Sequence, residues 1–204
     1  MSLARRRVGA LPLALIALLL VSACSAEELA PENVDEVVED DANEVVDEPV
    51  EREFRLPDGC REILPEPAID KLTSGEIDLL RGPGSWATEM VYPAGPSPQE
   101  ERGGISCLFG NVDETRTYTI SVAPMTQNTR AEVIDSLLAQ KLNTGQTLDG
   151  ALTYWIQGDQ DNVPAIFNAV YQDAWFEVLI FPGGRIAYEE AESLVNQMRD
   201  HNTQ

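Results

Sequence analysis

The sequence predicts an α+β fold in which an antiparallel sheet of about six strands carries helices on one face. Short β-rich runs, bounded by Pro, Gly, Asn and Asp, recur between residues 86 and 181. Each group of three runs is followed by a stretch with helical spacing of apolar residues, at 129–141 and at 187–199. The order strand, strand, strand, helix therefore occurs twice, which favours one sheet built from two similar units.

The first half begins with three predicted strands, at 86–92, 105–110 and 116–124. Apolar and small polar residues alternate in the third, as in a strand with one buried face. A helix is predicted next, because Thr129 is a good N-cap and Glu132 follows three residues later, as in a capping box.

The second half repeats this order, with predicted strands at 152–157, 163–171 and 174–181 and a final helix at 187–199. The two halves align at a near-constant offset: residues 105–112 match 163–170 at 58, and residues 135–140 match 192–197 at 57. We interpret this as two β-β-β-α units; the alternative is a chance likeness between amphipathic patterns.

The segment 58–80 precedes both units and is apolar enough to pack on the sheet. Pro65, Pro67 and Gly75 divide it, so we expect short helical pieces there. Of the three cysteines, Cys60 and Cys107 are predicted to form a disulfide, since the third, Cys24, has another use described below. The alternative is two buried free thiols.

The N-terminal 23 residues have the pattern of a signal peptide. Three arginines at 5–7 precede an uncharged apolar run from Val8 to Val21, which is too short to span a bilayer. The tetrapeptide Val21-Ser22-Ala23-Cys24 resembles the lipobox of bacterial lipoproteins. That resemblance implies cleavage before Cys24, lipid on its sulfur, and a location on the extracytoplasmic face of the cell membrane; the alternative is an ordinary signal peptide.

Residues 24–53 are predicted to be the lipidated cysteine and a disordered acidic tether. Ser25 to Glu53 contains 13 acidic residues and one basic residue, and it has no aromatic residue. Such a composition buries too little apolar surface to fold. The folded domain is then predicted to span 54–204, and its net charge of 10 − 22 = −12 argues against a nucleic-acid partner.

The arrangement as a whole resembles the small paired-cysteine envelope lipoproteins of actinobacteria. The residues that carry the resemblance are Gly59-Cys60 and Ile105-Ser106-Cys107, together with the lipobox. The resemblance implies an extracytoplasmic location and transfers no activity or site. We therefore expect a binding or interaction module, with the membrane as one partner through Cys24, and another envelope protein or an apolar small molecule as a further partner.

No motif points to catalysis, a metal or a cofactor. The only histidine, His201, lies in a C-terminal tail that we expect to fray, so it is a poor catalytic base. The acids Glu89 and Glu177 lie among apolar neighbours in predicted strands, where a raised pKa would suit general acid chemistry. An acid-based hydrolase is therefore the least favoured alternative, and the protein is predicted not to be an enzyme.

The candidate binding face is aromatic with a single acid, and it consists of Trp155, Trp175, Glu177, Leu179 and Phe181. Apolar area on a sheet face must be covered by something. The sequence leaves two alternatives: either the segment 58–80 covers this face, or a partly open groove remains for a small apolar ligand, a lipid or a partner protein.

Overall fold

The computed structural model describes residues 53–83, 95–111, 113 and 115–204, which belong to a unit spanning Asp47–Gln204. The elements in chain order are α1 (Glu66–Leu72), β1 (Asp78–Arg81), η1 (Glu100–Arg102), β2 (Ile105–Gly110), β3 (Thr117–Pro124), α2 (Gln127–Ala139), β4 (Asn143–Gln146), β5 (Leu152–Ile156), β6 (Ala165–Val170), β7 (Ala174–Phe181) and α3 (Arg185–His201). The predicted signal peptide, Cys24, the tether up to residue 52, and the predicted strand at 86–92 lie outside the described residues.

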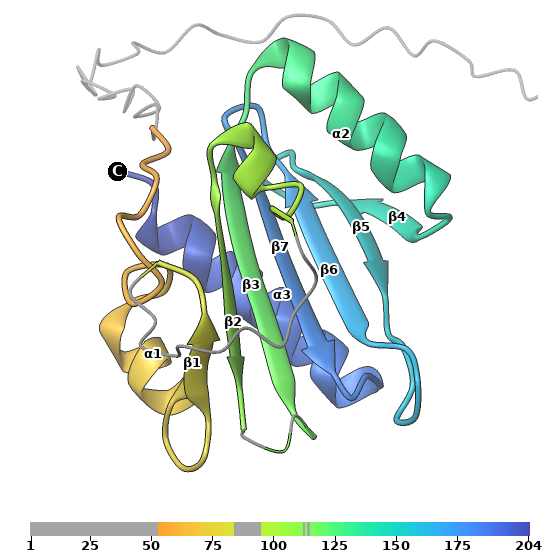
Figure 1. The fold of residues 1–204 in the computed structure, drawn as a ribbon. Coiled ribbons are helices and arrows are strands. Elements are labelled where there is room, and N and C mark those ends of the chain that lie inside the picture. Colours follow the sequence, from red (N-terminus) through yellow and green to blue (C-terminus); the bar gives the residue numbers. More distant parts are fainter. Residues whose placement is uncertain (1–52, 84–94, 112, 114) are drawn as a thin grey trace, which may run out of the picture. The chain divides into compact units, whose positions relative to one another are not determined.

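The strands form one antiparallel sheet in the order β1-β2-β3-β7-β6-β5-β4, so the predicted α+β class is confirmed (Figure 1). The triplets β1-β2-β3 and β5-β6-β7 occupy mirrored positions around the central β3–β7 pair. Their hairpins differ in register by two residues: Cys107 pairs with Ile120 in the first, while Ala165 pairs with Ile180 in the second. A shift of two keeps every side chain on its face.

One face of the sheet, which we call the α3 face, carries the main core. Helix α3 lies across it, behind the sheet in Figure 1. Phe176 of β7 is fully buried there and meets Phe54 and Tyr171 edge-on, at ring-centroid distances of 5.7 and 5.8 Å. The sheet and α3 side chains buried in this core include Cys107, Phe109, Tyr118, Ile120, Val122, Phe167, Val178, Ile180, Ala191, Leu194, Val195 and Met198.

The opposite face, which we call the α2 face, is covered in part by α2. Val133 and Leu137 of this helix pack with Tyr154, Val170 and Trp175 in a second, smaller cluster. We expected the helices to share one face of the sheet. This is correct for α1 and α3, whose buried residues join the main core, but wrong for α2, which lies on the opposite face. Tyr154, Val170 and Trp175 supply the apolar surface that α2 covers.

Two of the seven strands, β1 and β4, are not among the predicted ones, and both lie where the sequence has no alternating pattern. Strand β1 falls in the segment expected to be helical, and β4 is a four-residue edge strand whose side chains are all exposed. Helix α2 begins three residues earlier than predicted. Thr126 is its N-cap, and Thr129 is the third helical residue, each side chain bonding the backbone N–H of the other.

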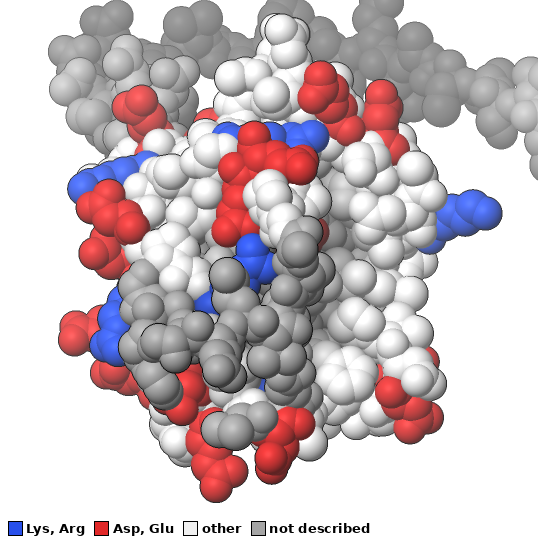
Figure 2. Space-filling model, in the orientation of Figure 1, with Lys and Arg blue, Asp and Glu red and all other residues white. Residues whose placement is uncertain are grey.

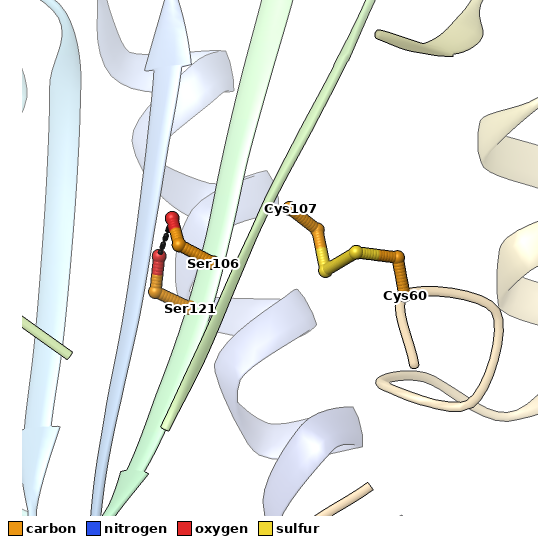
Figure 3. The surroundings of a disulfide bond; sticks show 4 residues. All are labelled: Cys60, Ser106, Cys107 and Ser121. Carbon is orange, nitrogen blue, oxygen red and sulfur yellow. Dashed lines mark hydrogen bonds between the residues drawn. A yellow bond between two sulfur atoms is a disulfide. The ribbon is translucent and has the colours of Figure 1, made fainter. Parts of the chain in front are cut away.

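The predicted disulfide is confirmed and joins the segment before α1 to the α3 face of β2. Cys60 and Cys107 are bonded with a Cα–Cα distance of 5.6 Å, and both are fully buried. Figure 3 shows the bond on one side of the strands, with Ser106 and Ser121 on the other. The segment 58–80 is thereby fixed to the α3 face.

The two ends of the described domain are paired with each other. Phe54 and Thr203 form a β-bridge, and Glu53 N–H donates to the Gln204 carbonyl at 2.8 Å. The prediction of a frayed C-terminus is therefore wrong: α3 continues to His201, and this bridge holds the residues after it. Within the described ranges, no helix combines the length and apolar character that crossing a bilayer requires.

Candidate functional site

The structure separates the residues of the candidate binding face. Trp175, Glu177, Leu179 and Phe181 alternate along β7 and share the α2 face. Trp155 does not join them. It pairs with Phe167, whose side chain belongs to the α3 core, and its ring stacks on Tyr188 of α3 at a centroid distance of 4.9 Å. Placing Trp155 on this face is therefore wrong, because its register in β5 turns it toward α3.

Trp175 is covered, although by a different element from the one expected. Only 4% of its surface is exposed, and the side chains packed with it come from α2 and from Met125, which precedes the N-cap of that helix. The segment 58–80 instead packs on the other face, through Ile63 and Leu72 among others. The indole N–H donates to Asn168 Oδ1 at 2.8 Å, so the polar end of the ring is satisfied as well.

A row of polar residues crosses the α2 face at the level of Glu177. The strand pairings place Ser106 opposite Ser121, Ser121 opposite Glu177, and Glu177 opposite Asn168. The two serine hydroxyls are 2.8 Å apart and hydrogen-bonded. Asn168 is fully buried and also donates to the Tyr154 carbonyl at 3.3 Å. The serine pair and Asn168 therefore have hydrogen-bond partners, while Glu177 lies between them as the acid of the row.

Burial raises the pKa of Glu177 to about 7, and the adjacent Gln99 amide offsets part of the rise. Gln99 is itself only 1% exposed, and its Nε2 has no partner with good hydrogen-bond geometry among the described residues. A carboxyl group removed from water in this way favours its neutral form. The other acid singled out by the sequence, Glu89, lies outside the described residues.

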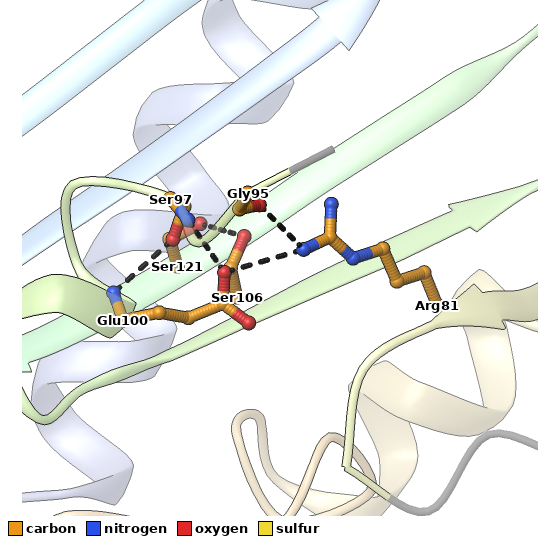
Figure 4. A network of polar contacts seen from close by, with 6 residues as sticks. All are labelled: Arg81, Gly95, Ser97, Glu100, Ser106 and Ser121. Atoms are coloured by element: carbon orange, nitrogen blue, oxygen red, sulfur yellow. Dashed lines mark hydrogen bonds and ion pairs between the residues drawn. The ribbon is translucent and has the colours of Figure 1, made fainter. Parts of the chain in front are cut away.

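The segment 95–102 is fixed over the β2–β3 side of the polar row (Figure 4). Ser97 N–H donates to Glu100 Oε2 at 2.6 Å, and Glu100 N–H donates to Ser97 Oγ at 3.2 Å. Arg81 lies 3.5 Å from the Glu100 carboxylate and donates to the Gly95 carbonyl. Figure 2 shows this face of the molecule, where the part over β5 and β6 is almost free of charged side chains.

A groove between α1 and α3, which we call the α1–α3 groove, is a cavity with the size of a ligand site. Its volume is about 540 Å³, within the range of small-molecule sites. It is lined by Ala68, Lys71, Leu72, Ser74, Ile77, Arg116, Tyr118, Ile186, Glu190, Ser193, Leu194 and Gln197. The lining therefore combines an apolar surface with a few charged groups.

Two charged side chains of the groove, Arg116 and Glu190, form a connected set with Tyr118 at the start of β3. Arg116 Nη2 lies 2.8 Å from Glu190 Oε2, and Arg116 Nε donates to the Tyr118 hydroxyl at 2.5 Å. The Arg116 guanidinium also lies 5.2 Å from the centre of the Tyr118 ring. Desolvation, followed by the Glu190 charge, raises the pKa of Tyr118, so the phenol stays protonated as a hydrogen-bonding group.

Apolar residues complete the groove, and one of them is unusually exposed to solvent. Ile186, in the first turn of α3, exposes 80% of its surface, whereas Leu72 and Leu194 deeper in the groove are buried. The lining comes from α1, the residue before β1, the start of β3, and α3. Sequence reasoning missed this site because these segments are far apart in the chain; the exposed Ile186 was the one local irregularity that could have marked it.

The described residues offer little else that could do chemistry. They contain no cluster of three His, Cys, Asp or Glu side chains able to hold a metal ion. His201 is exposed and lines a separate cavity with Asp58 and Glu62. Comparison with known proteins adds no relative: no family model matches the chain, and neither the curated proteins nor the solved structures contain a match.

Proposed function

We propose that this chain is a lipoprotein of the bacterial cell envelope, anchored through lipid on Cys24, whose folded domain is a binding module. The observation that carries the binding role is the α1–α3 groove, which has the size and the mixed lining of a small-molecule site. The ligand would lie between α1 and α3, with the apolar wall on one side and the Arg116–Glu190 pair on the other.

The disulfide supports the envelope location. Structural disulfides form and persist in oxidising compartments and are rare in the cytosol. Cys60 and Cys107 are buried and paired, which leaves Cys24 as the one remaining cysteine of the sequence. The disulfide therefore uses two of the three cysteines, and the third is the one that the lipobox resemblance assigns to lipid.

The acid-based hydrolase receives less support. The observation in its favour is the raised pKa of Glu177. However, the neighbouring Trp175 and Gln99 side chains are buried, which restricts the approach of a substrate to the carboxyl group. The carrier of a small apolar ligand or lipid receives more, because the α1–α3 groove has an apolar wall that reaches solvent at Ile186.

Metabolic labelling tests the anchor. Cells that express the full chain are fed an alkyne fatty acid, and the protein is purified and coupled to a fluorophore. We expect label on the wild-type protein and none on Cys24→Ala, with both in the same oxidised state at Cys60 and Cys107. A labelled Cys24→Ala protein, or an unlabelled wild type, would overturn the lipoprotein proposal.

Native mass spectrometry tests the groove. Protein purified from its own membrane should carry a co-purifying small molecule, and Ser193→Trp should lose it, because an indole at this exposed position of α3 fills the groove. Ser136→Trp is the matched control, since Ser136 is an exposed serine on α2 outside the groove. Equal retention of the molecule by both variants would contradict the proposed site.

A further inference from the structure

The α1–α3 groove has a charge that differs in sign from that of the domain around it. Residues 54–204 carry 10 − 22 = −12. The groove lining contains two basic residues, Lys71 and Arg116, and one acid, Glu190, which gives 2 − 1 = +1. A positive patch in an acidic domain attracts anions locally and distinguishes them from cations.

Lys71 is free to bind a ligand. It lies in the last turn of α1 with an exposed side chain and forms no ion pair with any described residue. The other basic residue is only partly engaged. Arg116 uses Nε and Nη2 for Tyr118 and Glu190, and its Nη1 donates to no described residue. Both cations therefore have donors left for an acceptor placed in the groove.

The rest of the lining suits an apolar body. Ile77, Leu72 and Leu194 form apolar wall, and Ile186 extends it to the solvent-exposed edge of the groove. Apolar area next to a cation with free donors suits a ligand that has both an apolar and an anionic part. A purely apolar ligand would leave the ammonium of Lys71 without a partner and Nη1 of Arg116 unused, and a bare anion would leave the apolar wall in water.

We infer that the α1–α3 groove binds a small amphipathic anion, with a carboxylate or phosphate at Lys71 and Arg116 and an apolar chain along Ile186 and Leu194. This inference deepens the proposed binding function and rests on it. The carboxylate and the phosphate share the recognition chemistry, since each presents charged acceptor oxygens to an ammonium and a guanidinium.

The test compares four probes that differ only in the headgroup: octanoate, octyl phosphate, octanol and octylammonium. Each is titrated by isothermal calorimetry at low ionic strength into the full mature chain carrying Cys24→Ser, which removes the lipid without shortening the protein. We expect both anions to bind about tenfold more tightly than octanol, and octylammonium to bind more weakly still. The ratio between octanoate and octyl phosphate distinguishes a carboxylate ligand from a phosphate one.

Variants show whether the groove is responsible. Lys71→Gln should reduce the preference for anions about threefold, leaving the share that Arg116 supplies, while the dissociation constant for octanol changes little because octanol carries no charge for Lys71 to bind. Lys141→Gln, the same change at an exposed lysine outside the groove, should keep the full preference. Ile186→Ser should weaken all four probes, and Leu138→Ser, at an exposed leucine on α2, should weaken none.

The outcomes separate the inference from the function beneath it. If octanol binds as tightly as octanoate, or if Lys141→Gln removes the preference as effectively as Lys71→Gln, the anion inference is overturned and a binding groove remains. If none of the four probes binds at millimolar concentration and no molecule co-purifies with the wild-type protein, the proposed function is overturned as well.

Discussion

The two faces of strand β7 show how differently one sheet can be buried on its two sides. On the α3 face, Phe176, Val178 and Ile180 pack into a continuous apolar core. On the α2 face, the intervening positions are Trp175, Glu177 and Leu179. The α3 face is covered by one long helix and a segment held by a disulfide, while the α2 face is covered by a helix over one half and by the segment 95–102 over part of the other.

The difference shows that burial on the α2 face depends on particular polar partners. An apolar side chain on the α3 face loses area and packing when it is truncated, and its neighbours relax only in part. On the α2 face, Trp175 and Asn168 also form a hydrogen bond, and the largely buried carboxyl group of Glu177 has a raised pKa. The effect of a substitution on the free energy of unfolding should therefore depend on polar groups and on pH for the α2 face. For the α3 face it should depend mainly on the side-chain volume that is removed.

The largest effect is expected from the disulfide that secures the α3 face. The double variant Cys60→Ala/Cys107→Ala should lose about 4 kcal/mol of unfolding free energy, since the bond closes a loop with a sequence separation of 47. Urea denaturation followed by circular dichroism measures the loss. Reduced wild type should match the variant, and a loss below about 1 kcal/mol would show that the cover over the α3 face is held by packing alone.

Trp175→Ala should cost about 3 kcal/mol, the next largest effect. The change leaves a cavity under α2 and removes the donor to Asn168 Oδ1, which is buried. Trp155→Ala is the comparison, because Trp155 is half-buried at the edge of the α3 face, and it should cost about half as much. An equal or smaller loss at Trp175 would mean that the α2 face is open at this point.

Glu177→Gln should change how stability depends on pH. The folded-state pKa of about 7 lies above the ordinary glutamate value of 4.5, so the folded protein holds a proton that the unfolded chain releases between these values. Wild-type stability from this group is present below pH 4.5 and is lost as pH rises through 7. A shift of this size corresponds to about 3 kcal/mol, which partial exposure of the side chain reduces to about 2 kcal/mol.

Urea denaturation at pH 5 and pH 8 measures this effect as the difference between Glu177→Gln and wild type. As the pH rises from 5 to 8, the free energy of unfolding of the variant should increase by about 2 kcal/mol relative to that of wild type. Glu132→Gln, at an exposed acid on α2, controls for the change in net charge. A difference that does not vary with pH would place the Glu177 carboxyl group in contact with water.

The smallest effect is expected at the Arg116–Glu190 pair. Its side chains expose 49% and 35% of their surface, so a double-mutant cycle with Arg116→Gln and Glu190→Gln should give a coupling free energy of about 0.5 kcal/mol. High salt should reduce it further. A coupling free energy above about 2 kcal/mol would show that this pair stabilises the fold. The proposed groove function instead gives the pair the main role of contacting a ligand.

The sequence predicts the fold where periodicity is strong. Tyr118, Ile120 and Val122 alternate with small polar residues, and the strand predicted there matches β3 to within one residue. Strand β4 escapes prediction because its residues are polar and exposed, so only backbone pairing with β5 defines it. The sequence also does not predict which face of the sheet α2 covers. Its two buried residues, Val133 and Leu137, indicate an apolar stripe on the helix, but this stripe fits either face of the sheet.

The candidate site is harder to predict than the fold. Glu177 stands out in the sequence as an acid in an apolar strand, and the structure shows the cause, a row of polar partners on the neighbouring strands. The sequence prediction places Trp155 on the same face, because an aromatic side chain by itself does not show toward which face of the sheet its strand turns it. The α1–α3 groove depends on contacts between residues as distant as Lys71 and Glu190, which only the tertiary fold brings together.

The bridge between Phe54 and Thr203 makes this domain a natural candidate for circular permutation. Because Glu53 and Gln204 exchange backbone hydrogen bonds, a linker of a few residues could join them without moving either end. New termini could be opened at the exposed 147–150 turn, where Leu148 is fully in solvent. A permuted chain of this kind would present β4 and β5 at opposite ends of the polypeptide while preserving the same sheet.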